Sequence, residues 1–253
     1  METYPLDHTG TIVHLALFTG IKNAAALRQR LVHASTLPDD DNGTAERAAV
    51  DFAFIDAAMI TSRLHVLTAI HQALLARSQG VLKTKTLHSE VIWMLEPGTN
   101  VRCSSTRPKA KPDDLASLVL STQISDSLKH FGLSTSTSSL LLVRIVPSDP
   151  SASSGMPGGD EVLRRMHDVI EGKLASLELL GRLPEGGTNE KSIRKVRFFV
   201  WERPSRDALN SHREQTYKLN QDAVFSSLKQ GSPEALQALD RLVISTVALK
   251  SVM

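Results

Sequence analysis

The hydrophobic and polar positions along the chain alternate between short apolar runs and segments of helical period. Four runs predict strands because each is short, apolar and bounded by turn residues: 11–18, 51–56, 90–96 and 138–146. Within the second run, Phe52 and Phe54 would lie on the face opposite Ala53, since side chains alternate along a strand. The run at 90–96 has no polar break, which predicts a strand buried on both faces.

Apolar residues recur at helical spacing in five other segments, which are 23–34, 57–78, 124–131, 161–180 and 233 to nearly 253. Asn23 is a candidate N-cap, and Gly80 and Gly132 would close their helices in a left-handed conformation. Ser232-Pro233-Glu234 opens the last helix with a cap, a proline and an early acid. The core-facing positions that the spacing predicts include Leu27, Leu31, Ile60, Leu64, Leu67, Ile70, Leu74, Ile124, Leu128, Phe131, Val162, Met166, Val169, Ile170, Leu174 and Leu177.

Strands interleaved with helices predict a mixed α/β (α+β) fold. We expect a single domain, 1–253, in which a central sheet of about four strands is packed by helices and extended by C-terminal helices. Segments rich in turn-forming or charged residues are predicted to be inserted surface loops: 35–50, 100–122, 147–160 and 203–215.

The composition of the chain excludes several classes of protein. The chain has 253 residues and 41% hydrophobic residues, enough for a buried core, and 29 Lys+Arg against 27 Asp+Glu give a net charge of +2. Any contact with nucleic acid must therefore come from a local patch. One cysteine, Cys103, excludes a disulfide framework and a cysteine-rich zinc site. Without a signal sequence or a long apolar stretch, a soluble intracellular protein is expected, with no membrane contact.

Catalytic motifs are missing from the sequence. The glycine-rich stretch 155–159 lacks the Lys and Ser/Thr of a phosphate-binding loop, and no G-x-S-x-G is present. His65 and His71 are six residues apart, which puts them on different faces of a helix rather than at metal-ligand spacing. Cys103 lies in a basic loop and is interpreted as a bystander thiol. We therefore expect no catalytic residue, no metal and no cofactor.

Two basic segments are candidate binding surfaces. Lys83-Thr84-Lys85-Thr86 lies just before the apolar run at 90–96, where its lysines could contact phosphate; a solubilising loop is the alternative. The segment 191–206 combines basic residues with three aromatic residues, which suits single-stranded nucleic acid. An element that buries those aromatic residues and exposes its cations is the alternative there.

The C-terminal helix is more apolar than one buried face requires. Its main stripe is formed by Leu236, Leu239, Val243 and Val247, and further apolar residues lie on its other faces. A terminal helix on one globular surface hides only one face, so the remainder must meet another element of the chain or a partner. The sequence leaves both possibilities open.

Five blocks follow one another in a distinctive order: VHLALFTGIKNAAALRQRL (13–31), DFAFID (51–56), AIHQALLA (69–76), KTKTLHSEVIWMLEP (83–97) and QISDSLKHFGL (123–133). In this order they resemble the PRPK-binding protein family (TPRKB), the small accessory subunit of the KEOPS/EKC complex. The resemblance resumes at 192–199 and in the terminal helix. The chain departs from the family by inserting a segment between Asn100 and Gln123, a pattern that suggests a fungal-type member.

The resemblance implies a non-catalytic subunit of the nucleus and cytoplasm. Such a subunit binds and activates a small atypical kinase/ATPase of the PRPK type, and through it meets the threonylcarbamoyl transferase. It also helps to bind tRNA, at the 3′ CCA end, for threonylcarbamoyladenosine modification beside the anticodon. Two alternatives stay open: a kinase-activating protein without direct tRNA binding and, more weakly, an independent small-molecule enzyme.

The resemblance also directs the candidate residues toward these partners. The stripe of the last helix (Leu236, Leu239, Val243 and Val247) and, on the helix 57–78, Arg63 and His71 are expected to contact the kinase. Lys83 and Lys85 are expected to contact tRNA, and Lys22 and Arg28 are candidates to extend that patch.

Overall fold

An antiparallel sheet organises the molecule. The computed structural model describes residues 1–96, 124–148, 158–183 and 232–250. Within them the sheet has five strands, which are β1 (Glu2–Leu6), β2 (Thr11–Thr19), β3 (Ala53–Asp56), β4 (Ser139–Pro147) and β5 (Lys173–Ala175). The strand order is β1-β2-β4-β3, and β5 pairs with the end of β2. The mixed α/β fold class is confirmed, and β2, β3 and β4 match three of the predicted strands.

Both faces of the sheet are covered, which explains the unbroken apolar runs Leu15–Phe18 in β2 and Leu140–Val143 in β4. In β2, Leu15 and Leu17 point to one face and Phe18 to the other, and all three are fully buried. In β3, Ala53 packs with Leu17 and Phe54 packs with Phe18, as the alternation predicts. A strand buried on both faces cannot show the polar alternation of a half-exposed strand.

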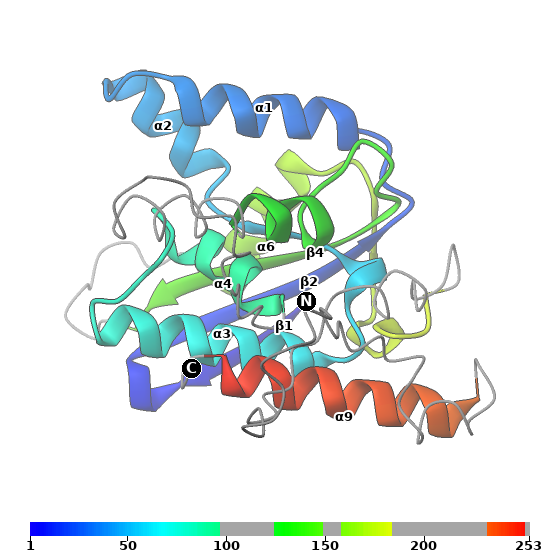
Figure 1. Ribbon diagram of the computed structural model, residues 1–253. Coiled ribbons are helices and arrows are strands. Elements are labelled where there is room, and N and C mark those ends of the chain that lie inside the picture. The colour runs from blue at the N-terminus through cyan, green and yellow to red at the C-terminus, as the bar shows by residue number, and fades with distance from the viewer. Residues whose placement is uncertain (97–123, 149–157, 184–231, 251–253) are drawn as a thin grey trace, which may run out of the picture.

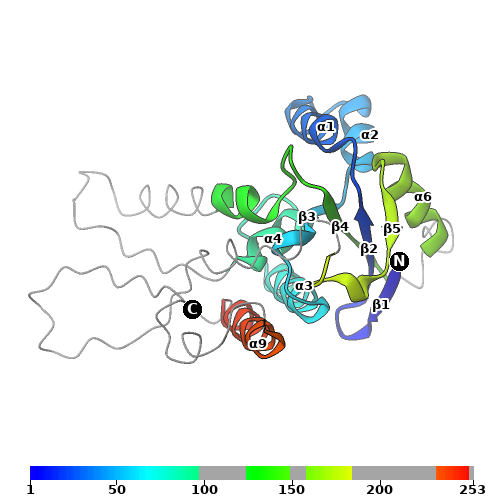
Figure 2. The ribbon, with the colours of Figure 1, turned by 90° about the vertical axis from the view of Figure 1, so that its right-hand side faces the viewer.

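Helices form a layer on each face of the sheet. They are α1 (Ala24–Thr36), α2 (Asp41–Ala49), α3 (Arg63–Ser78), α4 (Leu87–Leu95), α6 (Gly159–Val169) and α9 (Pro233–Leu249). Residues 124–131 are also helical, and short 3-10 turns occupy Asp7–Thr9 (η1), Ala57–Met59 (η2) and Leu177–Leu179 (η3). Helices α3 and α4 cover the Leu17 face, and α1 and α6 cover the Phe18 face (Figure 2). Helix α9 lies along the outer side of α3 (Figure 1).

Helix α9 begins as the sequence predicts. The Ser232 hydroxyl accepts a hydrogen bond from the Ala235 amide at 3.2 Å, and Pro233 occupies the first helical position. Of the predicted stripe, Leu239, Val243 and Val247 are buried in the same core as α3. These three side chains are therefore buried by α3, an element of the same chain, and not by a partner.

The prediction of a strand at 90–96 is wrong, because this run belongs to α4. The Thr86 hydroxyl accepts a hydrogen bond from the Ser89 amide at 3.1 Å and so begins the helix. Helix α4 is buried on several sides, including Glu90, Val91 and Leu95. A helix that is apolar all round has the same sequence pattern as a strand buried on both faces, so periodicity cannot separate the two.

The predicted loop at 35–50 contains a helix, α2. The Asp40 carboxylate accepts a hydrogen bond from the Gly43 amide at 2.6 Å, which caps the first turn. The acidic stretch that suggested a surface loop is thus the start of a short, mostly exposed helix. The expected insertions at 100–122 and 203–215, and most of that at 147–160, lie outside the described residues.

The predicted helix 161–180 ends early, at Val169, and the chain returns to the sheet as β5. A side chain at Gly172 would place its Cβ 2.7 Å from Ile21, so this position holds the chain close to the end of β2. Consequently Leu174 is 40% exposed, whereas Val162 and Met166 are buried as predicted. Strand β1, at the edge of the sheet, was not predicted.

The expected N-cap role of Asn23 is also corrected. Asn23 stands at the N-cap position of α1, but its side chain makes no capping bond. Instead its amide donates to the Val169 carbonyl at 2.9 Å and accepts from the Glu171 amide at 3.2 Å. The side chain therefore joins α1 to the end of α6, a tertiary role that helix-capping rules do not anticipate.

The glycine and leucine predictions on the helices are only partly confirmed. Gly80 follows α3 with a φ of +68°, as expected. Gly132 does not adopt the left-handed conformation; it permits a close approach, because a Cβ there would lie 2.3 Å from the Leu128 carbonyl oxygen. Leu64 and Leu128, expected in the core, are 56% and 42% exposed. Alanines such as Ala69 and Ala73 fill the buried face of α3 instead, which shifts its phase.

Candidate functional site

The lysine loop, defined as Lys83–Thr86, connects α3 to α4. Its shape is set from within by Glu90, a fully buried residue of α4. One oxygen of its carboxylate, Oε2, accepts hydrogen bonds from the Lys83 amide at 3.0 Å and from the Thr84 amide and hydroxyl, both at 2.8 Å. Lys83 and Lys85 are exposed on either side of the inward-bonded Thr84. The loop therefore presents two cations on a fixed backbone.

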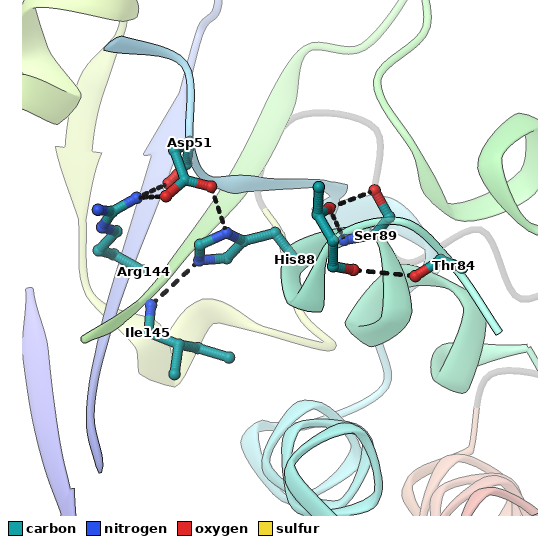
Figure 3. A network of polar contacts seen from close by, with 7 residues as sticks. Asp51, Thr84, His88, Ser89, Arg144 and Ile145 are labelled. Atoms are coloured by element: carbon teal, nitrogen blue, oxygen red, sulfur yellow. Dashed lines mark hydrogen bonds and ion pairs between the residues drawn. The ribbon is translucent and has the colours of Figure 1, made fainter. Parts of the chain in front are cut away.

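The start of α4 fixes the other end of the lysine loop. The Thr84 hydroxyl lies 2.9 Å from the Thr86 carbonyl oxygen, and the hydroxyls of Thr86 and Ser89 are 2.8 Å apart (Figure 3). Each threonine in K-T-K-T thus has a structural partner. Sequence reasoning singled out the lysines and missed Glu90, although the S-E pair of the same block marked its position.

Behind the lysine loop, His88 ties α4 to β3 and β4. Its Nδ1 lies 2.8 Å from the Asp51 carboxylate, and its Nε2 accepts a hydrogen bond from the Ile145 amide at 3.2 Å (Figure 3). Arg144 also donates to the Asp51 carboxylate and carbonyl. Because Nε2 already accepts a backbone hydrogen bond, His88 does not offer a free base to a substrate. The network positions α4.

The Asp51 carboxylate is held in its charged form by this network. Burial alone would raise the pKa of Asp51, but hydrogen bonds from His88 and Arg144 and the charge of Arg144 lower that pKa to about 2. Phe52 supports the arrangement, because the Arg144 guanidinium lies 5.7 Å from the centre of its ring.

Lys22 and Arg28, the two cations expected to extend the patch of the lysine loop, lie on another part of the molecule. Both residues are exposed, but they belong to the entrance and first turns of α1. Helix α1 packs on the Phe18 face of the sheet, whereas the lysine loop joins two helices of the Leu17 face. The sheet therefore lies between α1 and the two helices that the lysine loop connects.

The other end of α4 meets the C-terminal helix. Lys250, which follows α9, donates from Nζ to the carbonyls of Trp93 and Glu96, the latter at 2.9 Å. The ammonium also lies 3.8 Å from the centre of the Trp93 ring. Burial lowers the pKa of Lys250 to about 7, against the charges of Glu96 and Glu90, which act to raise it. Two carbonyls at the end of α4 are satisfied in this way.

Partly buried polar contacts also join α9 to α3 and to the residues just before it. The Thr61 hydroxyl donates to the Asp240 carboxylate at 2.6 Å, and the Gln72 amide donates to the Ala248 carbonyl at 3.2 Å. With Leu239, Val243 and Val247 buried between these contacts, the side chains expected to meet a kinase are inaccessible while α9 is docked. A partner that binds α9 in its docked position must therefore contact side chains on the other faces of this helix.

An exposed stripe on α3, defined as Leu64, Thr68, His71 and Leu75, runs beside α9. Leu64 is 56% and Leu75 is 42% exposed, and they occupy one side of the helix with His71 between them. The His71 ring stacks on His8, with centroids 5.1 Å apart.

Two of the residues expected to contact the kinase, His71 and Arg63, lie in or near this stripe. His71 belongs to the stripe, and Arg63, beside it, forms an ion pair with Glu2 at 2.9 Å. On α9, Leu236, near the start of the helix, is half-buried, and Leu249, at its end, is 55% exposed. The α3 stripe, Leu236 and Leu249 together define the α3–α9 surface.

Other sequence features lie outside this description. Cys103 and the basic, aromatic segment 191–206 are not among the described residues. Across the described ranges, no group of three or more His, Cys, Asp or Glu residues is placed to hold a metal ion. Within the same ranges, the helices are too short or too polar to cross a membrane.

Comparison with known proteins shows that the chain is similar to one protein family. A family model described as "Kinase binding protein CGI-121" matches residues 18–120 and 105–251. The chain is 30% identical over 190 residues to the EKC/KEOPS complex subunit cgi121 of Aspergillus fumigatus, covering 69% of this chain and 82% of that protein. It is 28% identical over 270 aligned positions to the EKC/KEOPS complex subunit CGI121 of Cryptococcus neoformans var. neoformans, covering 100% of both.

Proposed function

Because the chain belongs to the CGI-121 family of kinase binding proteins, we propose that it is the kinase-binding, kinase-activating subunit of an EKC/KEOPS complex. The observation that carries the proposal is the family match, which extends from the end of β2 through α9. The partner is a small atypical kinase of the PRPK type, and the threonylcarbamoyl transferase is reached through it. The subunit works without catalytic residues of its own, in the nucleus and cytoplasm.

The α3–α9 surface is the face that we assign to the kinase. Leu64, Leu75 and Leu249 are large apolar side chains that solvent reaches, and a binding partner would remove them from water. Around them, Arg63 and His71 supply a polar rim, the usual surround of an apolar contact. The assignment keeps the predicted contact between α9 and the kinase. The contact is made by the exposed Leu249, however, and not by the buried stripe.

The lysine loop is the part that we assign to tRNA. Lys83 and Lys85 carry charge without base-reading groups beside them, so they suit the sugar-phosphate backbone of a single-stranded end such as the 3′ CCA of tRNA. The backbone of the loop is held by Glu90, so the two ammonium groups project from a fixed position.

The kinase assignment is tested by isothermal titration of the purified kinase into three variants. Leu64→Glu and Leu249→Glu should each weaken binding at least about tenfold, because a charge would be desolvated in an apolar contact. Val32→Glu is the matched control, since Val32 is 58% exposed but lies on α1. Unchanged affinity for both α3–α9 variants would overturn the assignment of the surface.

Two further experiments separate the proposed function from its two alternatives. A tagged chain recovered with kinase and transferase excludes an independent small-molecule enzyme as its main role. A tRNA gel shift then separates the subunit that contacts RNA directly from one that only activates the kinase.

A further inference from the structure

Helix α4 makes polar contacts at both ends, with different parts of the chain. Near its start, the Glu90 carboxylate accepts the amides of Lys83 and Thr84 from the lysine loop. At its end, the carbonyls of Trp93 and Glu96 accept hydrogen bonds from Lys250, the residue that follows α9. A helix of nine residues therefore lies between the loop and the C-terminal helix.

The second oxygen of Glu90 has an unusual environment. Oε2 accepts three hydrogen bonds, but Oε1 is buried without a hydrogen-bond partner. A buried carboxylate is unfavourable unless an opposite charge compensates it. Lys250 supplies such a charge: its half-buried side chain places the ammonium 3.8 Å from the centre of the Trp93 ring, and the charge of Glu90 acts to raise the pKa of Lys250. Glu90 and Trp93 are three residues apart, so both belong to the same side of α4.

We propose that Glu90 and Lys250 couple the docking of α9 to the order of the lysine loop. With α9 docked, the ammonium compensates the buried carboxylate, which in turn holds the backbone of Lys83 and Thr84. When Lys250 moves away, the Glu90 carboxylate loses this compensating charge, and its hydrogen bonds with the Lys83 and Thr84 amides weaken. Because a coupling free energy is reciprocal, loosening the Glu90 contacts must also weaken the docking of α9.

The functional consequence rests on the proposed function, whereas the coupling is a property of the isolated chain. If α9 carries part of the kinase surface and the loop contacts tRNA, a kinase that stabilises docked α9 also fixes the loop in its RNA-binding shape. A failed kinase titration would leave the coupling intact, and a failed coupling experiment would leave kinase binding intact.

The experiment measures amide hydrogen exchange of the full chain by NMR at pH 6, where the Lys250 ammonium is charged. The readouts are the amides of Lys83 and Thr84, which donate to Glu90. Lys250→Met should accelerate their exchange about tenfold relative to the core amides of β2 and β4, the factor expected from weakening one charged hydrogen-bonded group. Arg241→Met is the control, since it removes a cation from an exposed position of α9.

A reciprocal variant keeps the test decisive if Lys250→Met folds poorly. Glu90→Gln should accelerate exchange of the Lys250 amide, which bonds the Val247 carbonyl at 3.2 Å, again relative to the strands. The proposal is overturned if Lys250→Met loosens α9 while the loop amides keep their protection. It is equally overturned if loop and strand amides accelerate by the same factor, because the effect is then one of global stability.

Discussion

The lysine loop and the α3–α9 surface are organised in opposite ways. The loop is polar inside and out: a buried carboxylate holds the backbone, and Lys83 and Lys85 stand in water. The α3–α9 surface is apolar outside, with Leu64 and Leu249 exposed, and its polar contacts are partly buried, between α9 and α3 or the residues just before α3. Contacts of charged groups weaken as salt rises, whereas apolar contacts do not. Salt concentration should therefore distinguish the two surfaces.

The largest effect should come from charging the buried side of α9. Val243→Glu places a carboxylate among side chains that pack against α3, where Val243 is 2% exposed. We expect a loss of about 3 kcal/mol in the free energy of unfolding, the cost typical of an unpaired buried charge. Urea denaturation measures it, with Ser245→Glu on the exposed side of α9 as the control. Equal stability of the two variants would mean that α9 is not part of the core.

The next effect concerns the lysine loop and is measured on tRNA. Lys83→Glu combined with Lys85→Glu should weaken tRNA binding more than about tenfold and reduce the slope of log affinity against log salt by about 1.4, because two phosphate contacts to a single strand are lost at about 0.7 each. Kinase binding should be unchanged.

Lys22→Glu combined with Arg28→Glu makes the same charge change on the opposite face of the sheet. It should leave the salt slope close to that of the unmodified chain. If both double variants flatten the slope equally, general charge rather than the lysine loop attracts tRNA.

A smaller effect tests the network that holds α4 beneath the lysine loop. The pKa of Asp51, about 2 in the folded chain, lies below its ordinary value of 3.8. The stabilisation is therefore fully present above about pH 4 and is lost as the pH falls toward 2. Because the Asp51 side chain is 40% exposed, we expect about 1 kcal/mol. Asp51→Asn should lose this pH dependence in thermal denaturation between pH 2 and 5, while Asp126→Asn should retain it.

The smallest effect is expected at His71. His71→Ala removes an exposed ring that stacks on His8, so the free energy of unfolding should change by less than about 1 kcal/mol. Thermal denaturation gives the stability, and titration with the kinase gives the affinity. A large loss of stability would place His71 in the core and remove it from the α3–α9 surface.

The sequence predicted elements whose signals are local. Ser232-Pro233-Glu234 opens α9, Gly80 closes α3, and the alternation of DFAFID assigns Phe54 and Ala53 to opposite faces, because each depends on residues a few positions apart. Elements fixed by distant contacts were missed. Strand β5 exists because it pairs with β2. The apolar run in α4 predicted a strand because a segment buried on several sides has the same apolar composition whether it is a strand or a helix.

The candidate site divides in the same way. Lys83 and Lys85 were found because cations beside a hydroxyl form a pattern in sequence, but Glu90 needed the fold to show what it holds. The stripe of α9 was found as a pattern, and only its packing on α3 showed which face is accessible.

The sequence by itself determined the family, the mixed α/β class, the start of α9 and the position of the lysine loop, since each is written in residues that are neighbours along the chain or in one helix. Tertiary structure decided the rest. It placed Lys22 and Lys83 beside helices that pack on opposite faces of the sheet, buried Val243 against α3, and brought Lys250 onto the end of α4. These outcomes depend on which apolar surfaces are buried against one another in the folded chain. The spacing of residues along the sequence does not specify this, because the surfaces come from distant segments.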